Sequence, residues 1–498
     1  MTVVHQQAGA GRCGRNHSSR LKFKAAANRV AFVFILLAAL VPFAAAQSTS
    51  QLSGSVTDPS GATVSGAKIT LIEPATGFNR TTESNSSGLY QFLDVQPGDY
   101  RLEAAATGFA PFIVTKVTLL VKLPSTVNVK FQVAGGVQSV TVEGEAPLIN
   151  RTDASLGNVV EQDQIAELPI ADRDVTYLLS LQPGVSYLGI QTLDQQGTDT
   201  RSGAVNGLRS DQSNVTLDGI GVNDENNGYA FHSVLNAPSD SVEEFRVTTA
   251  NANADAGYSS GAQVALVTKS GTNQFHGSAY EYNRNTIFSA NDPFLKSSQI
   301  QGGESNTAPK LLRNVFGATL GGPIRKNRLF FFFNYEGRRD AQGTSVLRTV
   351  PTAALRAGVL QYQCDTPSDC PGNTVVGTDG NPYTAQAGYL ALSPQQVTGI
   401  DPNGIGPSAG VASVLNLYPL PNTTYGDTVN TSGYRFSSNA DSSYNKYITR
   451  FDYHINSSGS QTLFARASMQ NFNEPLQQEF PGQAASSTIV DDSRGITV

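Results

Sequence analysis

The chain carries little charge and shows no excess of basic residues. Of its 498 residues only 15% are charged, and the formal net charge is -6. Proteins that bind nucleic acids neutralise phosphates with clustered Lys and Arg, so this composition argues against a nucleic-acid partner. Glycine (47 residues) and proline (24 residues) are plentiful, which favours many short strands joined by turns over long charged helices.

Long apolar runs are absent after the N-terminal region. The apolar run from Val30 to Val41 follows a basic stretch and precedes Ala44, Ala45 and Ala46, which is the layout of a secretory signal peptide over residues 1–46. A membrane anchor is the alternative, but the run of about a dozen residues is shorter than the ~20 that a spanning helix needs. Since no later run reaches that length, any later membrane span must consist of β-strands.

Histidine is scarce, and the familiar catalytic signatures are missing. Three of the 5 histidines follow the signal peptide, and none lies in an i, i+4 pair or near a cysteine. This spacing argues against a zinc site. The sequence also has no P-loop and no nucleophile elbow in a strand-to-helix context, so it predicts no enzyme and no cofactor.

Cysteine is equally scarce, with 3 in the chain. Cys13 lies within the signal peptide, and Cys364 and Cys370 flank a loop-like stretch. In an oxidising compartment this arrangement predicts a local disulfide.

Residues 47–134 have the pattern of a small β-sandwich. Apolar residues alternate with polar ones in about seven short segments, separated by turn sequences such as Asp58–Gly61 and Gln96–Asp99. The stretches Gly54–Asp58, Asn85–Phe92 and Pro97–Tyr100 resemble the carboxypeptidase regulatory-like domain, a transthyretin-like sandwich often appended to bacterial surface receptors. The resemblance implies no peptidase activity, and a spacer or docking role is favoured over sugar binding.

Residues 135–270 change to a mixed α and β texture. Ile165, Leu168, Val175, Leu178 and Leu179 have helical spacing, and Ala262–Lys269 has the pattern of a strand. Asp218–Gly219 predicts a turn after a strand. The sequence Ser241–Glu244 is a capping box, which predicts the start of a short helix.

Residues 271–498 contain segments with one apolar and one polar face. Tyr447–Ile455 and Thr462–Gln470 alternate in this way over ~10 residues, as transmembrane barrel strands do, and in Leu329–Glu336 one face is apolar while the other ends in Asn334 and Glu336. A soluble antiparallel sheet shows a similar alternation. The load of Phe and Tyr, together with long intervals rich in Gly, Pro and Asn, favours the membrane.

An ordered series of motifs carries a more specific resemblance. It consists of Glu167–Pro169, Gln182–Val185, Val205–Arg209, Leu217–Gly219, Val242–Val247 and Gly261–Ser278. This series resembles the plug of TonB-dependent transporters. Two further stretches, Phe316–Ile324 and Phe330–Gly337, are similar to the first barrel strands of the Oar-like branch.

The resemblance implies a mainly β fold in three parts after the signal peptide. These are a transthyretin-like β-sandwich (47–134), an α/β plug domain (135–270) and an incomplete antiparallel transmembrane β-barrel (271–498). A closed barrel of this class needs many more strands than the six to eight that fit here, and the last residues lack an aromatic closing strand. An open sheet edge in lipid is prohibitive, so the sequence predicts an N-terminal fragment that does not transport alone.

The resemblance also implies an uptake receptor and transporter in the outer membrane, with the sandwich and plug on the periplasmic side. Extracellular segments such as Gln361–Asn422 would capture an unknown ligand, carbohydrate or peptide, and plug movement would release it. The implied partners are outer-membrane lipid and the TonB–ExbB–ExbD complex. The alternatives are a surface or secreted carbohydrate-binding adhesion protein and an accessory module of an enzyme.

Two sets of residues are candidates for roles in such a transporter. Val137, Val140 and Val142 lie in an extended, β-prone segment ahead of the plug, as strand addition to TonB would require, although a plain plug strand fits as well. Arg209, Arg246 and Lys269 are expected to make polar contacts between plug and barrel, with ordinary surface charge as the alternative.

Overall fold

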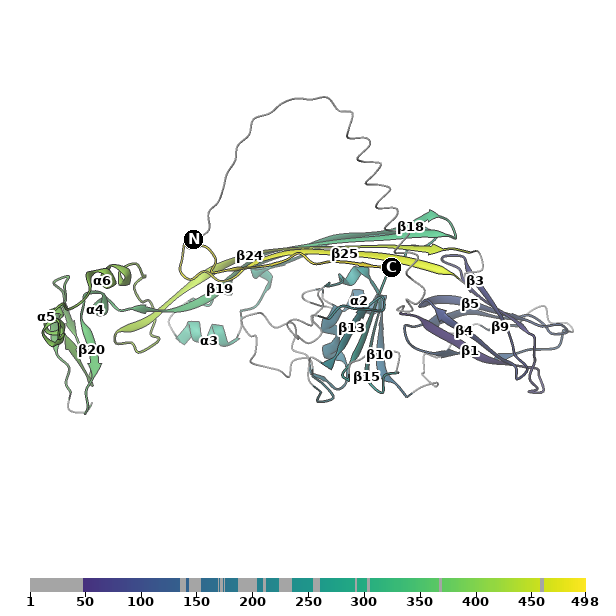
Figure 1. Ribbon diagram of the computed structural model, residues 1–498, viewed down its shortest axis with the longest axis horizontal. Coiled ribbons are helices and arrows are strands. Elements are labelled where there is room, and N and C mark those ends of the chain that lie inside the picture. Colours follow the sequence, from purple (N-terminus) through teal and green to yellow (C-terminus); the bar gives the residue numbers. More distant parts are fainter. Residues whose placement is uncertain are drawn as a thin grey trace, which may run out of the picture. The chain divides into compact units, whose positions relative to one another are not determined.

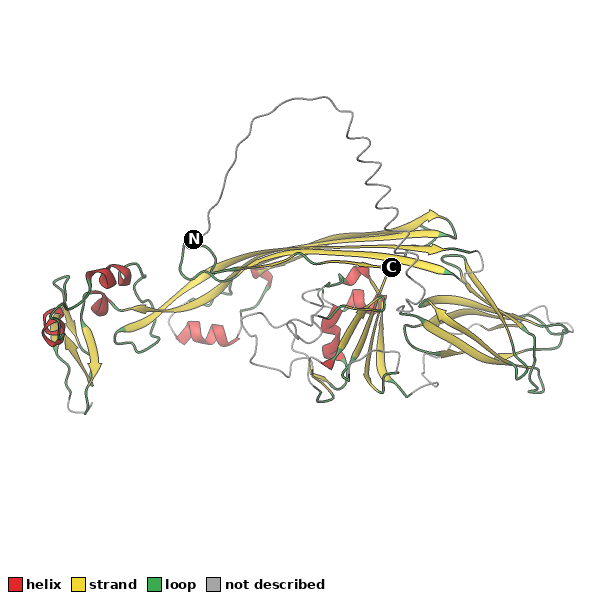
Figure 2. Cartoon of the chain, viewed as in Figure 1, coloured by secondary structure: helices red, strands yellow, loops and turns green. Residues whose placement is uncertain are grey.

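The computed structural model divides the chain into residues 1–47 and residues 48–498, and the fold below is that of the second unit. It describes residues 48–134, 140–142, 154–168, 170, 173, 175–186, 204–208, 212–223, 235–253, 260–291, 293–301, 305–366, 370–456 and 461–498. Strands dominate these residues, as Figure 2 shows, and helices are few and short. No helix among the described residues is long and apolar enough to cross a membrane.

The first part is a sandwich of two sheets. One sheet has the order β4-β1-β7, with β8 also paired to β1, and the other has the order β3-β2-β5-β6-β9. The strands are β1 (Ser50–Thr57), β2 (Lys68–Glu73), β3 (Phe78–Glu83), β4 (Leu89–Val95), β5 (Gly98–Ala105), β6 (Phe112–Leu119), β7 (Ser125–Thr126), β8 (Val129–Lys130) and β9 (Val140–Val142). The period-two residues Tyr90, Phe92, Tyr100 and Leu102 are buried in the common core, which confirms the predicted inward faces.

The plug is a five-stranded sheet with short helices beside it. The sheet has the order β10-β15-β16-β13-β14. Its strands are β10 (Leu156–Glu161), β13 (Asn214–Leu217), β14 (Ile220–Gly221), β15 (Val242–Ala250) and β16 (Gln263–Thr268), and a separate hairpin joins β11 (Val185–Ser186) to β12 (Ala204–Val205). The predicted helical stretch forms two short helices, α2 (Gln162–Glu167) and the 3-10 helix η1 (Val175–Leu181). Leu168 ends α2 in an extended conformation because the next residue is a proline, which disfavours a helical residue before it.

The helix predicted at the capping box is wrong. Ser239–Ser241 forms a single 3-10 turn (η4), and the following residues form strand β15. This strand lies between β10 and β16, so neighbours on both sides satisfy its backbone, and Val242, Phe245 and Val247 are buried in the plug core. The tertiary pairing outweighs the local capping signal.

The third part is one antiparallel sheet of long strands. Its order is β17-β18-β19-β24-β25-β26, with β27 also paired to β25, and Figure 1 shows β18, β19, β24 and β25 running side by side. The strands are β17 (His276–Asn285), β18 (Leu311–Arg325), β19 (Leu329–Pro351), β24 (Thr431–His454), β25 (Thr462–Pro475), β26 (Thr488–Asp491) and β27 (Arg494–Thr497). The sheet is open, as the predicted incomplete barrel requires.

The strands are longer than the sequence pattern predicts, since β19 has 23 residues and β24 has 24. The apolar alternation of β19 stops near Arg338 and Arg339, but pairing with β24 continues to Pro351. The alternation of apolar and polar side chains depends on the surroundings of each face of the strand. Pairing between strands depends on backbone hydrogen bonds, so it continues where neither face is apolar. The predicted length of ~10 residues is therefore the apolar part of each strand only.

The interval between β19 and β24 folds into a small insert and is not a bare loop. Its elements are α4 (Ala353–Arg356), β20 (Leu360–Gln363), β21 (Thr374–Val376), β22 (Pro382–Thr384), β23 (Tyr389–Leu392), α5 (Pro394–Ile400) and α6 (Ala409–Leu415). Ala354, Val359, Ala385 and Ala391 form its own apolar core. Between β17 and β18 the chain forms the 3-10 turn η6 (Thr286–Phe288) and helix α3 (Pro293–Gln301).

Candidate functional site at the plug and strand interface

Strands β24 and β25 bury a mainly polar face and expose an apolar face, whereas the buried face of β19 begins with Phe330 and Phe332 and continues with Asn334 and Glu336. On β24, Phe451 is 43% exposed and Tyr453 38%, whereas Arg450 and Asp452 between and beside them are 6% and 4% exposed. On β25, Leu463 and Met469 are exposed while Arg466, Ser468 and Gln470 are buried. A water-soluble sheet has the reverse arrangement, so the exposed apolar face requires an apolar surrounding.

A two-residue turn of the plug brings a carboxylate to the buried polar face. Asp218 and Gly219 connect β13 to β14, in which Leu217 pairs with Ile220. Both residues have positive φ angles, 51° and 87°, as in the type I′ hairpin turn that Asp-Gly sequences favour. The Asp218 carboxylate is buried at the tip of this turn.

Two arginines of the long strands bind this carboxylate. Arg466 Nε lies 2.8 Å from Asp218 Oδ2, and Arg450 Nη1 lies 3.3 Å from Asp218 Oδ1. Arg466 Nη2 also donates to the Leu217 carbonyl oxygen at 3.2 Å, which extends the contact to the plug backbone. Removing either partner from such a buried pair leaves an uncompensated charge, so these contacts are individually costly to break.

Thr268 and Asp452 complete the cluster. The Thr268 amide and hydroxyl donate to the two Asp218 oxygens, both at 2.9 Å, and Arg450 Nη1 donates to the Thr268 carbonyl at 2.8 Å. Arg450 Nε and Nη2 donate to the Asp452 carboxylate at 2.9–3.1 Å. The two arginines are thus matched by two carboxylates, which lets the cluster stay charged without water.

A second charged contact joins the plug to β17 and β19. Arg173 Nε donates to Glu336 Oε2 at 3.2 Å, and its guanidinium also pairs with Asp240 of the plug. The same guanidinium lies over the rings of Tyr280 and Tyr282, at 4.7 and 4.4 Å from their centres. Burial lowers the pKa of Arg173, but the nearby Asp240 and Glu336 carboxylates raise it by more, so the group stays charged.

An apolar contact and a backbone contact accompany these ion pairs. Ile448 of β24 packs in the plug's own core with residues such as Val264 and Leu266. The Asn236 amide donates to the side-chain oxygen of Gln470 on β25 at 3.0 Å. Gly271, after the last plug strand, lies so close to the long strands that an added Cβ would come within 2.3 Å of the Phe331 carbonyl oxygen. Only glycine fits there without a shift of the backbone.

The candidate TonB-contact residues are placed in part. Val140 and Val142 form β9, a parallel edge strand of the sandwich in which Val140 pairs with Phe112 and Val142 with Val114 of β6. Strand β9 is therefore not a strand of the plug sheet. Val137 lies outside the described residues.

The three candidate plug cations have different surroundings. Arg246 donates from Nη1 to the Val121 carbonyl at 3.0 Å and from Nη2 to Ser155 Oγ at 3.3 Å, so these partners belong to the sandwich and the plug. The positive charge of Lys269 acts on the Glu243 carboxyl of the plug. Arg209 lies outside the described residues. The plug-to-strand ion pairs described above use other residues, with the plug carboxylate Asp218 at their centre.

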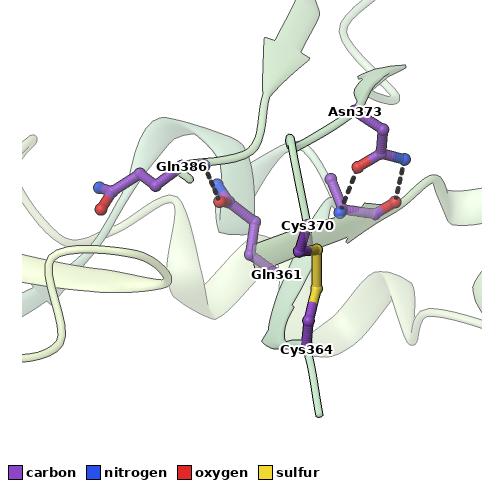
Figure 3. Close-up of a disulfide and its surroundings, with 6 residues drawn as sticks. Gln361, Cys364, Cys370, Asn373 and Gln386 are labelled. Atoms are coloured by element: carbon purple, nitrogen blue, oxygen red, sulfur yellow. Dashed lines mark hydrogen bonds between the residues drawn. A yellow bond between two sulfur atoms is a disulfide. The ribbon is translucent and has the colours of Figure 1, made fainter. Parts of the chain in front are cut away.

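The insert between β19 and β24 holds the two cysteines. Figure 3 shows the disulfide between Cys364 and Cys370, whose Cα atoms are 6.3 Å apart. Asn373 binds both backbone groups of Ala391, with its oxygen 2.6 Å from the Ala391 amide. Within the described residues no group of three or more His, Cys, Asp or Glu side chains is arranged to hold a metal ion.

The sequence predicts the turn at Asp218 and the polar face of the long strands. It does not predict that this turn contacts this face. A signal was present, because Arg450 and Arg466 alternate with apolar residues in segments assigned to the membrane. A charged residue on the inner face of such a strand needs a partner in the space that the sheet encloses. Arg450 and Arg466 are therefore the sequence signal for a plug contact, and plug carboxylates are the partners that they require.

Family models match three consecutive parts of the chain. The carboxypeptidase regulatory-like domain matches residues 51–132, the TonB-dependent receptor plug domain matches residues 151–264, and the outer membrane beta barrel domain matches residues 267–496. The three matches follow the order of the sandwich, the plug and the long-stranded sheet.

A curated relative agrees with these models. The TonB-dependent transporter Oar of Myxococcus xanthus is 26% identical over 281 residues, which cover 54% of this chain and 24% of that protein. The match thus spans about a quarter of the relative's length.

Solved structures add little. A streptococcal ancillary pilin is 17% identical over 17% of this chain and 32% of its own, and a putative carbohydrate binding protein from Bacteroides uniformis is 20% identical over 17% and 41%. Both have TM-scores of 0.15, which carry no functional argument. The ordered family models and the curated relative show a mainly β chain of the outer membrane, whose regulatory-like sandwich, plug and incomplete barrel are similar in kind and order to those of the Oar-like TonB-dependent transporters.

Proposed function

We propose that the protein takes up a ligand across the outer membrane. Segments on the outer side, including the insert between Thr352 and Asn430, capture the ligand, and movement of the plug releases it inwards. The observation that carries this proposal is the arrangement of the long-stranded sheet. Its apolar face is exposed, and its polar face packs against a separately folded plug. No covalent chemistry is part of the proposal.

The polar character of the interface suits a plug that must move. A wholly apolar contact would gain free energy from burial over its whole area, and no single event would release it. The cluster around Asp218 depends on a few directional contacts, and its arginines can exchange the carboxylate for water once water enters. The interface is therefore stable while water is excluded from the ion pairs, and it can separate when a force on the plug lets water in.

The energy for this movement would come from TonB, with ExbB and ExbD as its energising partners. Strand β9 supports this part of the proposal, because it ends a sheet and is followed in the chain by the plug. A sheet-edge strand can pair with a partner through main-chain hydrogen bonds. The ligand is proposed only by class, as a carbohydrate or a peptide.

The proposal can be tested by cysteine labelling in cells without knowing the ligand. Ser468 is buried on the polar face of β25, so a cysteine in Ser468→Cys reacts with a maleimide only after the plug has moved. Ser437 on β24 is exposed, so Ser437→Cys is a control that should react in all cells. We expect labelling of Ser468→Cys in cells with active TonB and much less in cells without TonB or with a protonophore.

Two outcomes would contradict the proposal. The first is equal labelling of Ser468→Cys with and without TonB. The second is recovery of the native protein in a soluble fraction, because the exposed apolar face should require detergent for extraction from the outer membrane.

A further inference from the structure

Two side chains of the plug hold one residue of the sandwich. Val121 follows strand β6, and its amide donates to Glu244 Oε1 at 2.7 Å while its carbonyl oxygen accepts from Arg246 Nη1 at 3.0 Å. Glu244 and Arg246 belong to β15 and lie two positions apart, so both side chains point to the same face of the plug sheet. Both backbone groups of Val121 are therefore bound by the plug.

The Val121 side chain is bound as well. It is completely buried and forms a small apolar cluster with Ala265 and Val267 on strand β16, the neighbour of β15. Glu244 and Arg246 are also buried, so the two hydrogen bonds are shielded from water. Hydrogen bonds that are shielded from water are stronger than the same bonds at the surface. We call these contacts of Val121, Glu244, Arg246, Ala265 and Val267 the Val121 clamp.

The strand that leads into the clamp also carries β9. On the edge of the sandwich sheet, Phe112 and Val114 of β6 pair with Val140 and Val142 of β9. β6 ends at Leu119, and Val121 lies two residues farther along the chain. One strand therefore contacts both the segment ahead of the plug, at its start, and the plug sheet, just after its end.

We propose that the sandwich is a mechanical relay between β9 and the plug. A partner that captures β9 by adding a strand pulls on β6, and the Val121 clamp passes that pull to β15 and β16 in the middle of the plug sheet. The chain itself passes the pull only to β10, at the edge of that sheet. The identity of the partner rests on the proposed function, whereas the clamp does not.

Hydrogen exchange on the full chain in detergent tests the clamp itself. The Val121→Ala variant removes the apolar contact without changing the plug, and Glu244→Ala removes the acceptor of the Val121 amide. Because each lost contact is worth about 1–3 kcal/mol, exchange of the peptide around 119–123 should accelerate about tenfold to hundredfold. Exchange of the sandwich core around Leu102 should not change.

Matched controls are available on both sides of the clamp. Glu167 is exposed in α2 of the plug, and Val133 is exposed in the sandwich, so Glu167→Ala and Val133→Ala should leave exchange at 119–123 as it is. If Val121→Ala and Glu244→Ala exchange at the rate of these controls, the clamp does not exist in solution and the proposal is overturned. If Glu244→Ala fails to fold, Val121→Ala decides alone.

A cysteine pair tests the relay. The Phe112→Cys, Val140→Cys double variant joins paired residues of β6 and β9, so its oxidised form keeps β9 on β6. Purified TonB C-terminal domain, added to the full chain, should accelerate exchange at 119–123 in both forms, because the relay runs through the paired β9 and β6. Acceleration in the reduced form alone would mean that β9 must leave β6 and would overturn the relay. Failure of TonB to bind either form would contradict the proposed function and leave the exchange result on the clamp standing.

Discussion

The sandwich and the long-stranded sheet both alternate apolar and polar side chains along their strands. The sandwich buries the apolar side chains, whereas β24 and β25 of the long-stranded sheet bury the polar ones. In the sandwich, Tyr90 and Phe92 of β4 point into the core while Leu93 remains exposed. In the long-stranded sheet, Arg450 and Asp452 are buried while Phe451 is exposed. Alternation with a period of two therefore identifies a strand. It does not show which face of the strand packs against protein and which face meets water or lipid.

The covering material differs accordingly. The two sheets of the sandwich bury their apolar side chains against each other in one common core. Against the polar face of the long-stranded sheet, the plug supplies carboxylate and carbonyl partners for the arginines. Two domains that look independent in sequence therefore form one buried polar layer.

The largest test of this comparison is the loss of one buried arginine. Arg466→Ala leaves the Asp218 carboxylate buried with one cation fewer and should cost about 3–5 kcal/mol of the free energy of unfolding. The urea midpoint of the protein in detergent micelles measures the change. Arg435 on β24 is exposed, so Arg435→Ala is a matched control that should change stability by less than about 0.5 kcal/mol. Equal effects of the two substitutions would break the comparison.

A matched pair of leucines tests the difference in solvent directly. Leu320 on β18 is 48% exposed and Leu93 on β4 is 47% exposed, so burial does not distinguish them. Leu320→Arg puts a charge on the apolar face of the barrel strands and should cost about 2–4 kcal/mol of folding free energy in lipid vesicles. Leu93→Arg puts the same charge in water and should cost close to nothing. A small effect at both positions would mean that the long strands face water.

The disulfide should stabilise only the insert between β19 and β24. It closes a loop with a sequence separation of 6, for which loop-closure entropy gives about 2 kcal/mol. Cys364→Ser should increase protease cleavage within residues 352–430 and leave the urea midpoint of the sandwich unchanged. Treating the wild type with a reductant should reproduce the effect, and the same treatment should not alter Cys364→Ser.

The Val121 clamp should also depend on pH. Burial raises the pKa of Glu244 from about 4.5 to about 8, while the hydrogen bond from the Val121 amide and the charge of Arg246 lower it and the charges of Glu243 and Glu161 raise it. The closed clamp thus holds a proton more tightly than the open form, so closure is favoured at low pH and weakens as pH rises from about 4.5 to 8. One proton changes the opening equilibrium at most about tenfold per pH unit.

Hydrogen exchange at 119–123, corrected for the intrinsic rate, measures this dependence between pH 5 and 9. In Glu244→Gln the side chain keeps an oxygen acceptor and does not titrate, so its corrected exchange should be independent of pH. A steeper dependence of the corrected exchange rate on pH in the wild type than in Glu244→Gln would support the role of Glu244. Equal dependence in the two proteins would contradict it.

Much of the fold was predictable, because short-range patterns carry it. The inward residues of β4 and β5, the turn at Asp218–Gly219 and the apolar parts of β19, β24 and β25 all follow from residue alternation and turn chemistry. The capping box at Ser241 misled, since the residues after it have two strand neighbours that no local pattern contains. Strand lengths were underestimated because polar residues pair as well as apolar ones.

The candidate site was predictable only in its parts. Arg450, Arg466 and Asp218 each have a local signature, but Arg466 is far from the plug residues that it contacts (249 positions from Leu217), and the contact depends on the plug lying against the strands. The same holds for Val121, which nothing in the sequence singles out.

The sequence by itself determined the class of each part and the order of the three parts, since alternation, turn residues and family motifs are local properties of the chain. Only the tertiary structure decided which charges pair, because Arg466 and Asp218 meet through chain reversals far apart in sequence. It also decided that β9 joins the sandwich and not the plug. A strand pairs with whichever free edge lies within reach, and the position of that edge is set by the fold of the neighbouring residues.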